Sequence, residues 1–395
     1  MREPSPFVAG NPERPSLRYL FLRFLRIGAL AWGGPLAQIH LMHRELVERD
    51  GWASEEEFRK TLAVYQVIPG PEAQELAVWF GVRKRGRAGG LATGLAFLLP
   101  GTLLVLALAW AYVAYGVSEA ADHPLLYGLK AAAVGLVAGA VVRLARRWVD
   151  RAELAAIVLL VVALDLLVPD LGFVPLLVLG GVLAFAAALA RGEAALPIRA
   201  APAALLPLAL SSVALPVLTL SGAGAIAFLF LKAGFLTFGG AYTILPILEE
   251  DAILAHGWIT HAQFADAAAL AGVVPAPFVS VGAFVGYLVA GFPGAGIALA
   301  CIYLPAFGLT LLGHRHLERL VRAPRLHIFL VGVTAAVVGL VAATAVALGQ
   351  AALPDAPAAA IALAVAAVTI AGRGNVAFVM LAAGAAGYAW RVLAV

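Results

Sequence analysis

The sequence predicts an all-α integral membrane protein made of two inverted-topology repeats with broken or re-entrant helices. Three observations predict it: the composition, a proline motif that occurs twice, and a swap of positive charge between equivalent loops. Of the 395 residues, 63% are hydrophobic and 13% are charged, whereas a typical soluble domain has about 25% charged residues. Apolar runs long enough to cross roughly 30 Å of hydrocarbon recur in about 13 segments.

The chain divides into four parts. Residues 1–18 are a polar, proline-rich tail without the apolar core of a signal peptide, which we interpret as disordered and cytoplasmic. Residues 19–200 form the first repeat, 201–222 a linking transmembrane segment without a counterpart, and 223–395 the second repeat. The unpaired segment supplies the odd crossing that inverts the second repeat relative to the first.

Each repeat contains a Pro-x-Pro motif within an apolar run. Pro69-Gly70-Pro71 is matched 206 positions later (69 to 275) by Pro275-Ala276-Pro277. Proline removes a backbone donor and clashes with the preceding turn, so an unbroken helix is excluded here. In hydrocarbon, such a break persists only where protein or a water-lined cavity satisfies the freed backbone groups. Matching breaks in two halves indicate the binding site of a transporter.

The same offset aligns features other than proline. A Gly-Gly pair, a Gly-Trp pair and a helix capping box each occur once in each repeat. They are Gly33-Gly34 with Gly239-Gly240, Gly51-Trp52 with Gly257-Trp258, and Ser54–Glu57 with Thr260–Gln263. This set in one fixed register is hard to obtain by chance, so the two halves are interpreted as copies of one unit.

Positive charge changes place between equivalent loops of the two repeats. The basic loop at 83–87 has a counterpart near 289–293 without lysine or arginine, and the basic loop at 314–325 has one at 116–124 without either. Because basic loops face the cytoplasm, this swap predicts that the repeats lie upside down relative to one another.

The polar stretches inside the broken segments bear on how those segments cross the membrane. Residues 43–60 contain lysine and arginine, whereas 249–263 contain neither and are acidic. If the broken segments span fully, the basic stretch lies outside, against the positive-inside rule. We therefore favour re-entrant hairpins, with full spans as the alternative.

The four chain breaks are expected to meet near the bilayer midplane and to bind an anion. Helices that start after glycine or proline direct free N–H groups, and about half a positive charge each, into the break. Glycine also lets a ligand approach the backbone closely, although close helix packing is an alternative for a Gly-Gly pair. The expected binding residues are Gly33, Gly34, Pro69, Gly70, Pro71, Gly239, Gly240, Pro275, Ala276 and Pro277.

A cation stands about two turns before each Gly-Gly pair. Arg26 and Lys232 are repeat partners at the same offset, and cations inside membrane segments usually face a cavity or a partner. We therefore assign both to the binding site. Snorkelling to the interface is the alternative for both, and it fits Arg23 better.

Acidic residues near the breaks are candidates for coupling and gating. A carboxylate beside an anion site would repel the cargo unless it is protonated, so Glu72, with Glu75 one turn on, is the candidate for proton coupling. Charge compensation at a helix N-terminus is the alternative. Glu45 and Asp251 are repeat partners, and we assign them a gating or salt-bridge role.

No metal, cofactor or nucleic-acid site is predicted. Cys301 is the only cysteine, and the His40/His43 and His314/His316 pairs lack the ligand count of a metal site. The motifs of ATP-driven pumps and membrane hydrolases are missing from the sequence, so no enzyme is predicted. The small net charge of +4, carried mainly in loops, fits orientation in a lipid bilayer.

Taken together, these motifs resemble the chromate ion transporter family in its two-domain, long-chain form. The matching segments are Phe24–Gly34, Gly51-Trp52, Ser54–Phe58, Pro69–Ala73, Phe230–Gly240, Gly257-Trp258, Pro275–Phe278 and Phe284–Tyr287. Ala276 replaces the glycine of the family's second Pro-Gly-Pro motif, and Ala241 stands where glycine is common.

The resemblance implies a secondary active transporter that exports chromate across the bacterial inner membrane and confers chromate resistance. It implies alternating access around a midplane anion site, driven by the proton gradient or the membrane potential. Transport of sulfate or another oxyanion, and a passive anion channel, stay open as alternatives. A homodimer is compatible with the sequence.

Overall fold

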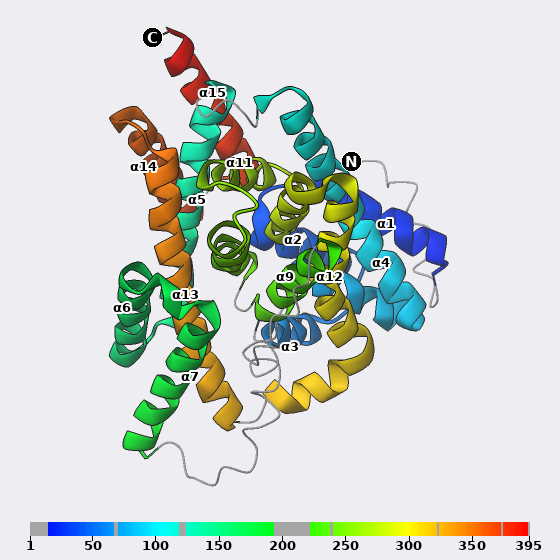
Figure 1. The fold of residues 1–395 in the computed structure, drawn as a ribbon. Coiled ribbons are helices and arrows are strands. Elements are labelled where there is room, and N and C mark those ends of the chain that lie inside the picture. The colour runs from blue at the N-terminus through cyan, green and yellow to red at the C-terminus, as the bar shows by residue number, and fades with distance from the viewer. Residues whose placement is uncertain are drawn as a thin grey trace.

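The computed structural model describes residues 15–66, 70–117, 124–192, 222–237, 240–321, 324–372 and 374–393, and every regular element in these ranges is a helix (Figure 1). The prediction of an all-α protein is confirmed. The linking segment predicted at 201–222 lies outside these ranges except for its last residue, and most of the N-terminal tail lies outside them too.

The first half runs from α1 to α7. Its elements are α1 (Leu17–Leu30), α2 (Gly34–Met42), the π-helix η1 (His43–Arg49), α3 (Glu55–Tyr65), α4 (Glu72–Ala114), α5 (Pro124–Trp148), α6 (Ala152–Leu167), the short 3-10 helix η3 (Pro169–Leu171) and α7 (Phe173–Ala190).

The second half repeats this order from α9 to α15. Its elements are α9 (Ala223–Leu236), the 3-10 helix η4 (Ala241–Thr243), α10 (Ile244–Leu248), the π-helix η5 (Glu249–Ala255), α11 (His261–Gly272), the 3-10 helix η6 (Phe278–Ser280), α12 (Val281–Val321), α13 (Pro324–Ala352), α14 (Ala356–Ala371) and α15 (Val376–Leu393).

The early elements of the two halves match residue by residue. Helices α1 and α9 have the same bounds at an offset of 206 (17 to 223), and so do η1 and η5 (43 to 249). Because π-helices are rare and often occur at functional sites, a matched pair in one register supports a structural repeat. Both predicted capping boxes form, at Ser54 with Glu57 and at Thr260 with Gln263.

The basic segment at 83–87, expected as a loop, is the junction between two helical segments of α4. The helical backbone is interrupted at Arg85 and Gly86, where Gly86 has a φ of 60°. Helix α12 has an equivalent break at Ala290 and Gly291, with a φ of 61° at Gly291. Glycine adopts this left-handed conformation without steric cost, so two residues in each half, the second of them glycine, join two helical segments.

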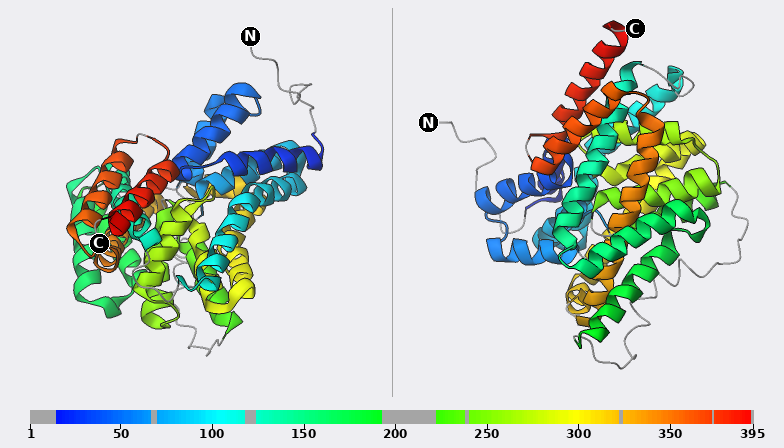
Figure 2. Two further views of the ribbon diagram at one scale, coloured as in Figure 1. Left: turned by 90° about the horizontal axis from the view of Figure 1, so that it is seen from above. Right: turned by 90° about the vertical axis from the view of Figure 1, so that its left-hand side faces the viewer.

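The later helices of the two halves exchange partners. Helix α5 packs against α14 and α15 of the second half, and α13 packs against α6 and α7 of the first (Figures 1 and 2). A Cβ added to Gly128 on α5 would lie 2.2 Å from the carbonyl oxygen of Ala383, and one added to Gly332 on α13 would lie 2.3 Å from that of Gly180. The backbones therefore touch, and the two halves share one core.

Six of the described helices are long and apolar enough to cross a membrane, and two shorter apolar helices, α9 and α14, accompany them. Large apolar side chains on their outer faces, such as Leu103, Leu363 and Phe378, are more than half exposed. Contiguous apolar surface of this kind requires lipid rather than water. The chain is a multi-pass membrane protein. The six long spans are Glu72–Ala114, Leu126–Trp148, Phe173–Ala190, Phe278–Leu311, His327–Ala352 and Val376–Leu393.

Candidate functional site: the chain breaks

Glycines in left-handed conformations open three of the four breaks. Side chains other than hydrogen are strained at such angles, so glycine is needed at each of these positions. Pro69 and Gly239, both predicted site residues, lie outside the described residues. The φ angles are 111°, 82°, 143° and 136° for Gly33, Gly34, Gly70 and Gly240.

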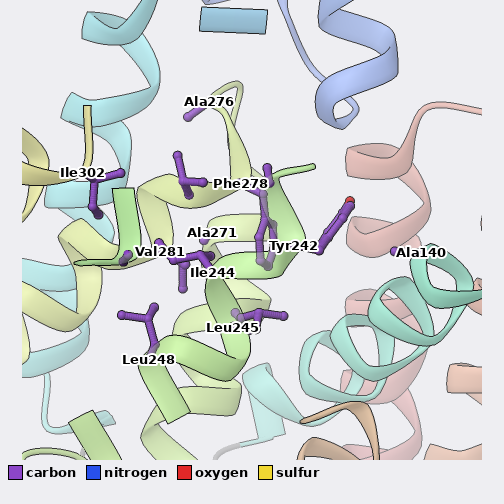
Figure 3. Close-up of a cluster of buried hydrophobic side chains, with 14 of the residues drawn as sticks. Ala140, Tyr242, Ile244, Leu245, Leu248, Ala271, Ala276, Phe278, Val281 and Ile302 are labelled. Atoms are coloured by element: carbon purple, nitrogen blue, oxygen red, sulfur yellow. The ribbon is translucent and has the colours of Figure 1, made fainter. Parts of the chain in front are cut away.

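The breaks of both halves meet around the segment that begins at Thr237. The backbone N–H of Gly70 donates to the carbonyl oxygen of Thr237 over 2.9 Å. A Cβ added to Gly34 would lie 3.6 Å from the hydroxyl oxygen of Tyr242. The ring of Tyr242 packs against Phe278, with 4.7 Å between centroids (Figure 3). The structure thus brings the four breaks together where the halves meet; their role in binding stays a prediction.

The tip of the second Pro-x-Pro motif packs directly on helix α4. A Cβ added to Gly101 would lie 2.4 Å from the Cβ of Ala276 and 2.5 Å from the carbonyl oxygen of Pro275. The methyl group of Ala276 therefore fits because the facing residue of α4 has no side chain. The departure from Pro-Gly-Pro is accommodated by α4, and the tip still packs closely.

The first turn of α4 places two carboxyl groups in the interior at the break. Glu72 is 6% exposed and Glu75 is fully buried. A Cβ added to Gly70 would lie 2.8 Å from Oε1 of Glu75, so this carboxyl group lies against the break. Within the described ranges neither oxygen of Glu75 has a hydrogen-bond partner. The guanidinium group of Arg147 on α5 interacts electrostatically with Glu72.

Arg23 does not snorkel to the interface, and that interpretation is wrong. Its side chain is buried, with Nη2 3.0 Å from Oε2 of Glu45 and 2.8 Å from Oδ2 of Asp50. Two carboxylates, one in η1 and one directly after it, therefore hold the guanidinium group inside the protein.

Lys232 makes the equivalent contact in the second half. Its Nζ lies 2.9 Å from Oδ1 of Asp251 and 3.9 Å from Oε1 of Glu250. In each half, therefore, a carboxylate of the π-helix at the Glu45/Asp251 repeat position pairs with a cation of the first helix. Arg26, the repeat partner of Lys232, is exposed, because its half uses the arginine one turn earlier. Positions three apart share a helix face, so the offset alone could not distinguish the two arginines.

A buried ion pair that the sequence analysis missed joins the two halves. Asp266 on α11 accepts a hydrogen bond from the Tyr112 hydroxyl of α4 over 2.7 Å. Its other carboxylate oxygen lies 3.6 Å from Nζ of Lys130 on α5. Asp266 and Lys130 are 3% and 7% exposed. Each is an isolated ionisable residue in an apolar run, which is the signal that could have identified them, since such residues in membranes are rare and usually paired.

Glu249, the first residue of η5, lies outside the long apolar helices and is largely buried. Burial raises the pKa of its carboxyl group to about 7; a hydrogen bond with Thr344 opposes the shift, and Asp165 adds to it. Nε2 of His261 lies 3.7 Å from Oε1 of Glu249. Glu249 lies in the same π-helix as Asp251, two residues before it.

A pocket of about 310 Å³ lies between the ends of α5, α6, α7 and α13. Arg147, Arg151, Arg191 and His327 line it together with acidic residues, among them Glu153. Among the residues that the structure describes, no group of three or more histidine, cysteine, aspartate or glutamate side chains could hold a metal ion. Within this lining Glu153 pairs with Arg151 and with Arg191.

Comparison with known proteins finds one family in both halves. The sequence pattern of the family described as chromate transporter matches residues 18–186 and again residues 224–388. The chain belongs to the chromate transporter family. It is a transporter and not an enzyme, and its two matched segments correspond to the two halves of the fold.

Relatives of this transporter align with nearly its whole length. A chromate transport protein of Pseudomonas aeruginosa is 40% identical over 95% of this chain and 93% of its own. A probable chromate transport protein of Synechococcus elongatus is 36% identical over 87% of both chains. A chromate transport protein of Cupriavidus metallidurans is 34% identical over 88% of this chain and 86% of its own. No solved structure matches this chain.

Proposed function

We propose that this transporter exports chromate across the bacterial inner membrane by secondary active transport, coupled to the proton gradient or the membrane potential. One anion site opens alternately to the two sides of the membrane. The observation that carries the proposal is the meeting of chain breaks from both halves in a protein of the chromate transporter family. Chromate is a tetrahedral dianion, and free N–H groups at helix starts are donors suited to it.

The two halves are proposed to lie upside down relative to one another, with the broken segments as re-entrant hairpins. The N-terminus and the basic loops then face the cytoplasm. Support comes from the swap of lysine and arginine between equivalent loops and from the pocket to which the first half contributes Arg147, Arg151 and Arg191. Inverted repeats place a binding site near the midplane at their interface.

The anion is proposed to bind at the breaks, with Arg26 and Lys232 as its cationic partners. Lys232 is held by Asp251 and Glu250, so it reaches an anion only when this ion pair opens. That requirement supports a gating role for Asp251 and, by the repeat, for Glu45. Arg26 is exposed and contributes only in a conformation that turns it inward.

Glu72 and Glu75 are proposed to couple transport to protons. An ionised carboxylate that is buried without a partner costs several kcal/mol, and at the break it would also repel a dianion. Protonation of each acid removes its own burial cost and its repulsion of the anion, so binding of protons and binding of the anion depend on each other.

Flux of radiolabelled chromate into proteoliposomes, under imposed pH gradients and potassium diffusion potentials, tests the function. We expect saturable chromate flux that follows an imposed gradient and that sulfate inhibits only weakly. Faster sulfate than chromate flux would reassign the cargo. Flux that ignores both gradients and saturates weakly would identify a passive channel and overturn active transport.

Variants separate the proposed roles in the same assay. Glu72→Gln is expected to uncouple chromate flux from the pH gradient, whereas Glu56→Gln, at an exposed position of α3, should leave coupling unchanged. Retained pH-driven accumulation in Glu72→Gln would remove its role. Arg26→Ala and Lys232→Ala are each expected to weaken chromate binding; unchanged affinity in both would remove these cations from the site.

A further inference from the structure

We propose that the side chains of Gln74 and Ser280 donate hydrogen bonds to the transported anion, one from each half of the protein. The inference rests on the proposed function and names the side chains that would carry its binding step. Gln74 lies three residues after Pro71, and Ser280 lies three residues after Pro277. The two positions are 206 apart (74 to 280) and are therefore repeat partners.

The backbone builds the same turn around both residues. The N–H of Gln74 donates to the carbonyl oxygen of Pro71 over 2.8 Å, and that of Ser280 donates to the carbonyl oxygen of Pro277 over 2.9 Å. Both side chains are 0% exposed. Polar residues are seldom fully buried, so packing alone does not explain a polar residue at the same interior point of both halves.

The polar atoms of these two side chains have no hydrogen-bond partner in the part of the chain that the structure describes. This holds for Nε2 and Oε1 of Gln74 and for Oγ of Ser280. Buried polar groups are nearly always hydrogen-bonded, and an unsatisfied one destabilises the fold. Thr93, on the same helix as Gln74 and equally buried, shows the usual case: its hydroxyl donates to the carbonyl oxygen of Ala77 over 2.7 Å. Gln74 and Ser280 therefore call for a partner from outside the chain.

Both turns adjoin the segment where the breaks meet. Gly70, at the start of the first turn, donates to Thr237, and Phe278, in the same 3-10 helix as Ser280, packs on Tyr242. Thr237 and Tyr242 flank the Gly-Gly break of the second half. The turns that carry the two repeat-related donors therefore contact residues on either side of the same break.

A third buried donor approaches this place from α12. The hydroxyl of Tyr303 is fully enclosed and has no partner among the described residues. Tyr303 lies one turn before Ala306, whose Cβ would be 3.3 Å from a Cβ added to Gly70. Helix α12 therefore carries an unused O–H group one turn from the residue that contacts Gly70.

A tetrahedral oxyanion is the ligand that this set of donors fits. Its oxygens accept hydrogen bonds, and amide N–H and hydroxyl O–H groups supply them alongside free backbone N–H groups. A tetrahedral ion has two-fold axes, so equivalent donors from two repeated halves can engage opposite pairs of its oxygens. Uncharged donors also let the dianion leave again, since transport requires binding that is weak enough for release.

Equilibrium binding of radiolabelled chromate to the full chain in lipid nanodiscs, paired with thermal unfolding in the absence of anion, tests the inference. The variants are Gln74→Met and Ser280→Ala, with Thr93→Ala as the buried polar control. We expect the Kd for chromate to rise about tenfold or more in each test variant, the change that follows from loss of one hydrogen bond to a charged group. Their unfolding midpoints should stay unchanged or rise, because an unpaired polar group has been removed. Thr93→Ala should lower the midpoint and keep the Kd.

The possible results distinguish a failure of this inference from a failure of the proposed chromate transport. If the wild type binds chromate and both test variants bind with the same Kd, the inference is overturned while the proposed function stands. A lowered midpoint with unchanged Kd, as expected for Thr93→Ala, would also overturn it by showing a structural role. Absence of chromate binding by the wild type would overturn the proposed function itself. If Gln74→Met does not fold, Ser280→Ala decides alone, since it removes a single oxygen atom.

Discussion

Replacing Lys130 with methionine removes the cation from the buried pair that joins the two halves and leaves Asp266 charged in the interior. The atoms of the pair are 3.6 Å apart, which corresponds to about 4–5 kcal/mol of attraction at an effective dielectric constant near 20. Asp266 keeps the hydrogen bond from Tyr112, which offsets part of the loss. We therefore expect Lys130→Met to lower the free energy of unfolding by about 3–5 kcal/mol, as for other buried pairs that lose one partner.

The double variant Lys130→Met/Asp266→Asn is the decisive control. It removes both charges, so no uncompensated charge stays buried, and the free energy of unfolding should return to within about 1–2 kcal/mol of the wild type. The measurement is unfolding of the full chain in mixed micelles with increasing denaturing detergent, followed by the fluorescence of its 7 tryptophans. The same samples report chromate binding, so a stability effect can be told from a binding effect.

Two outcomes would refute this reasoning. If Lys130→Met lowers the free energy of unfolding by less than about 1 kcal/mol, the pair contributes no more than a solvent-exposed salt bridge. A double variant as unstable as the sum of the single variants would show that the two side chains do not act on each other.

Three further predictions follow from contacts elsewhere in the fold, each measured as stability of the full chain. Arg23→Met should lower the free energy of unfolding by about 1–3 kcal/mol because it removes the buried cation that Glu45 and Asp50 share and leaves them with the more exposed Arg49. Arg26→Met should change it by less than about 0.5 kcal/mol; equal losses would contradict this difference. Gly28→Ala would put a Cβ 2.2 Å from a carbonyl oxygen of α4 and should cost about 2 kcal/mol, whereas Gly296→Ala enters open space and should be neutral or slightly stabilising. Glu249 has a pKa of about 7 in the folded state against a reference of 4.5, so between these pH values the folded state holds a proton that the unfolded state has lost. The free energy of unfolding should therefore fall by up to about 3 kcal/mol as pH rises through this range. Glu249→Gln should abolish this pH dependence, and a wild type whose stability is flat from about pH 5 to 8 would contradict the prediction.

The features that the sequence could predict are local. The capping boxes at Ser54 and Thr260 form because the residues that make them are three apart in the chain. The Gly-Gly and Pro-x-Pro motifs interrupt helices in both halves, and their fixed offset revealed the repeat. The matched π-helices were not predicted, because they differ from α-helices only in hydrogen-bond register and have no distinct composition.

The features that could not be predicted depend on which helices pack together. Lys130 and Asp266 come from different halves, and only the packing of α5 against α11 brings them within reach of each other. Arg23, and not Arg26, pairs with the carboxylates of η1 and Asp50. The sequence could not predict this, because the two arginines lie three residues apart on neighbouring faces of α1. The segment at 83–87 was predicted as a loop from its charge, and the chain makes this connection with only two non-helical residues, Arg85 and Gly86.

Because α5 and α13 each pack against helices of the opposite half, the first half can complete its packing only after the second half has been synthesised. During synthesis, α5 leaves the ribosome long before its neighbours α14 and α15, so one side of the first half has to wait for the end of the chain. The last helices to enter the membrane are the ones that close the half made first. A polypeptide that stops before Ala356 therefore lacks α14 and α15, the two helices that cover this side of α5. We expect quality-control proteases to degrade it.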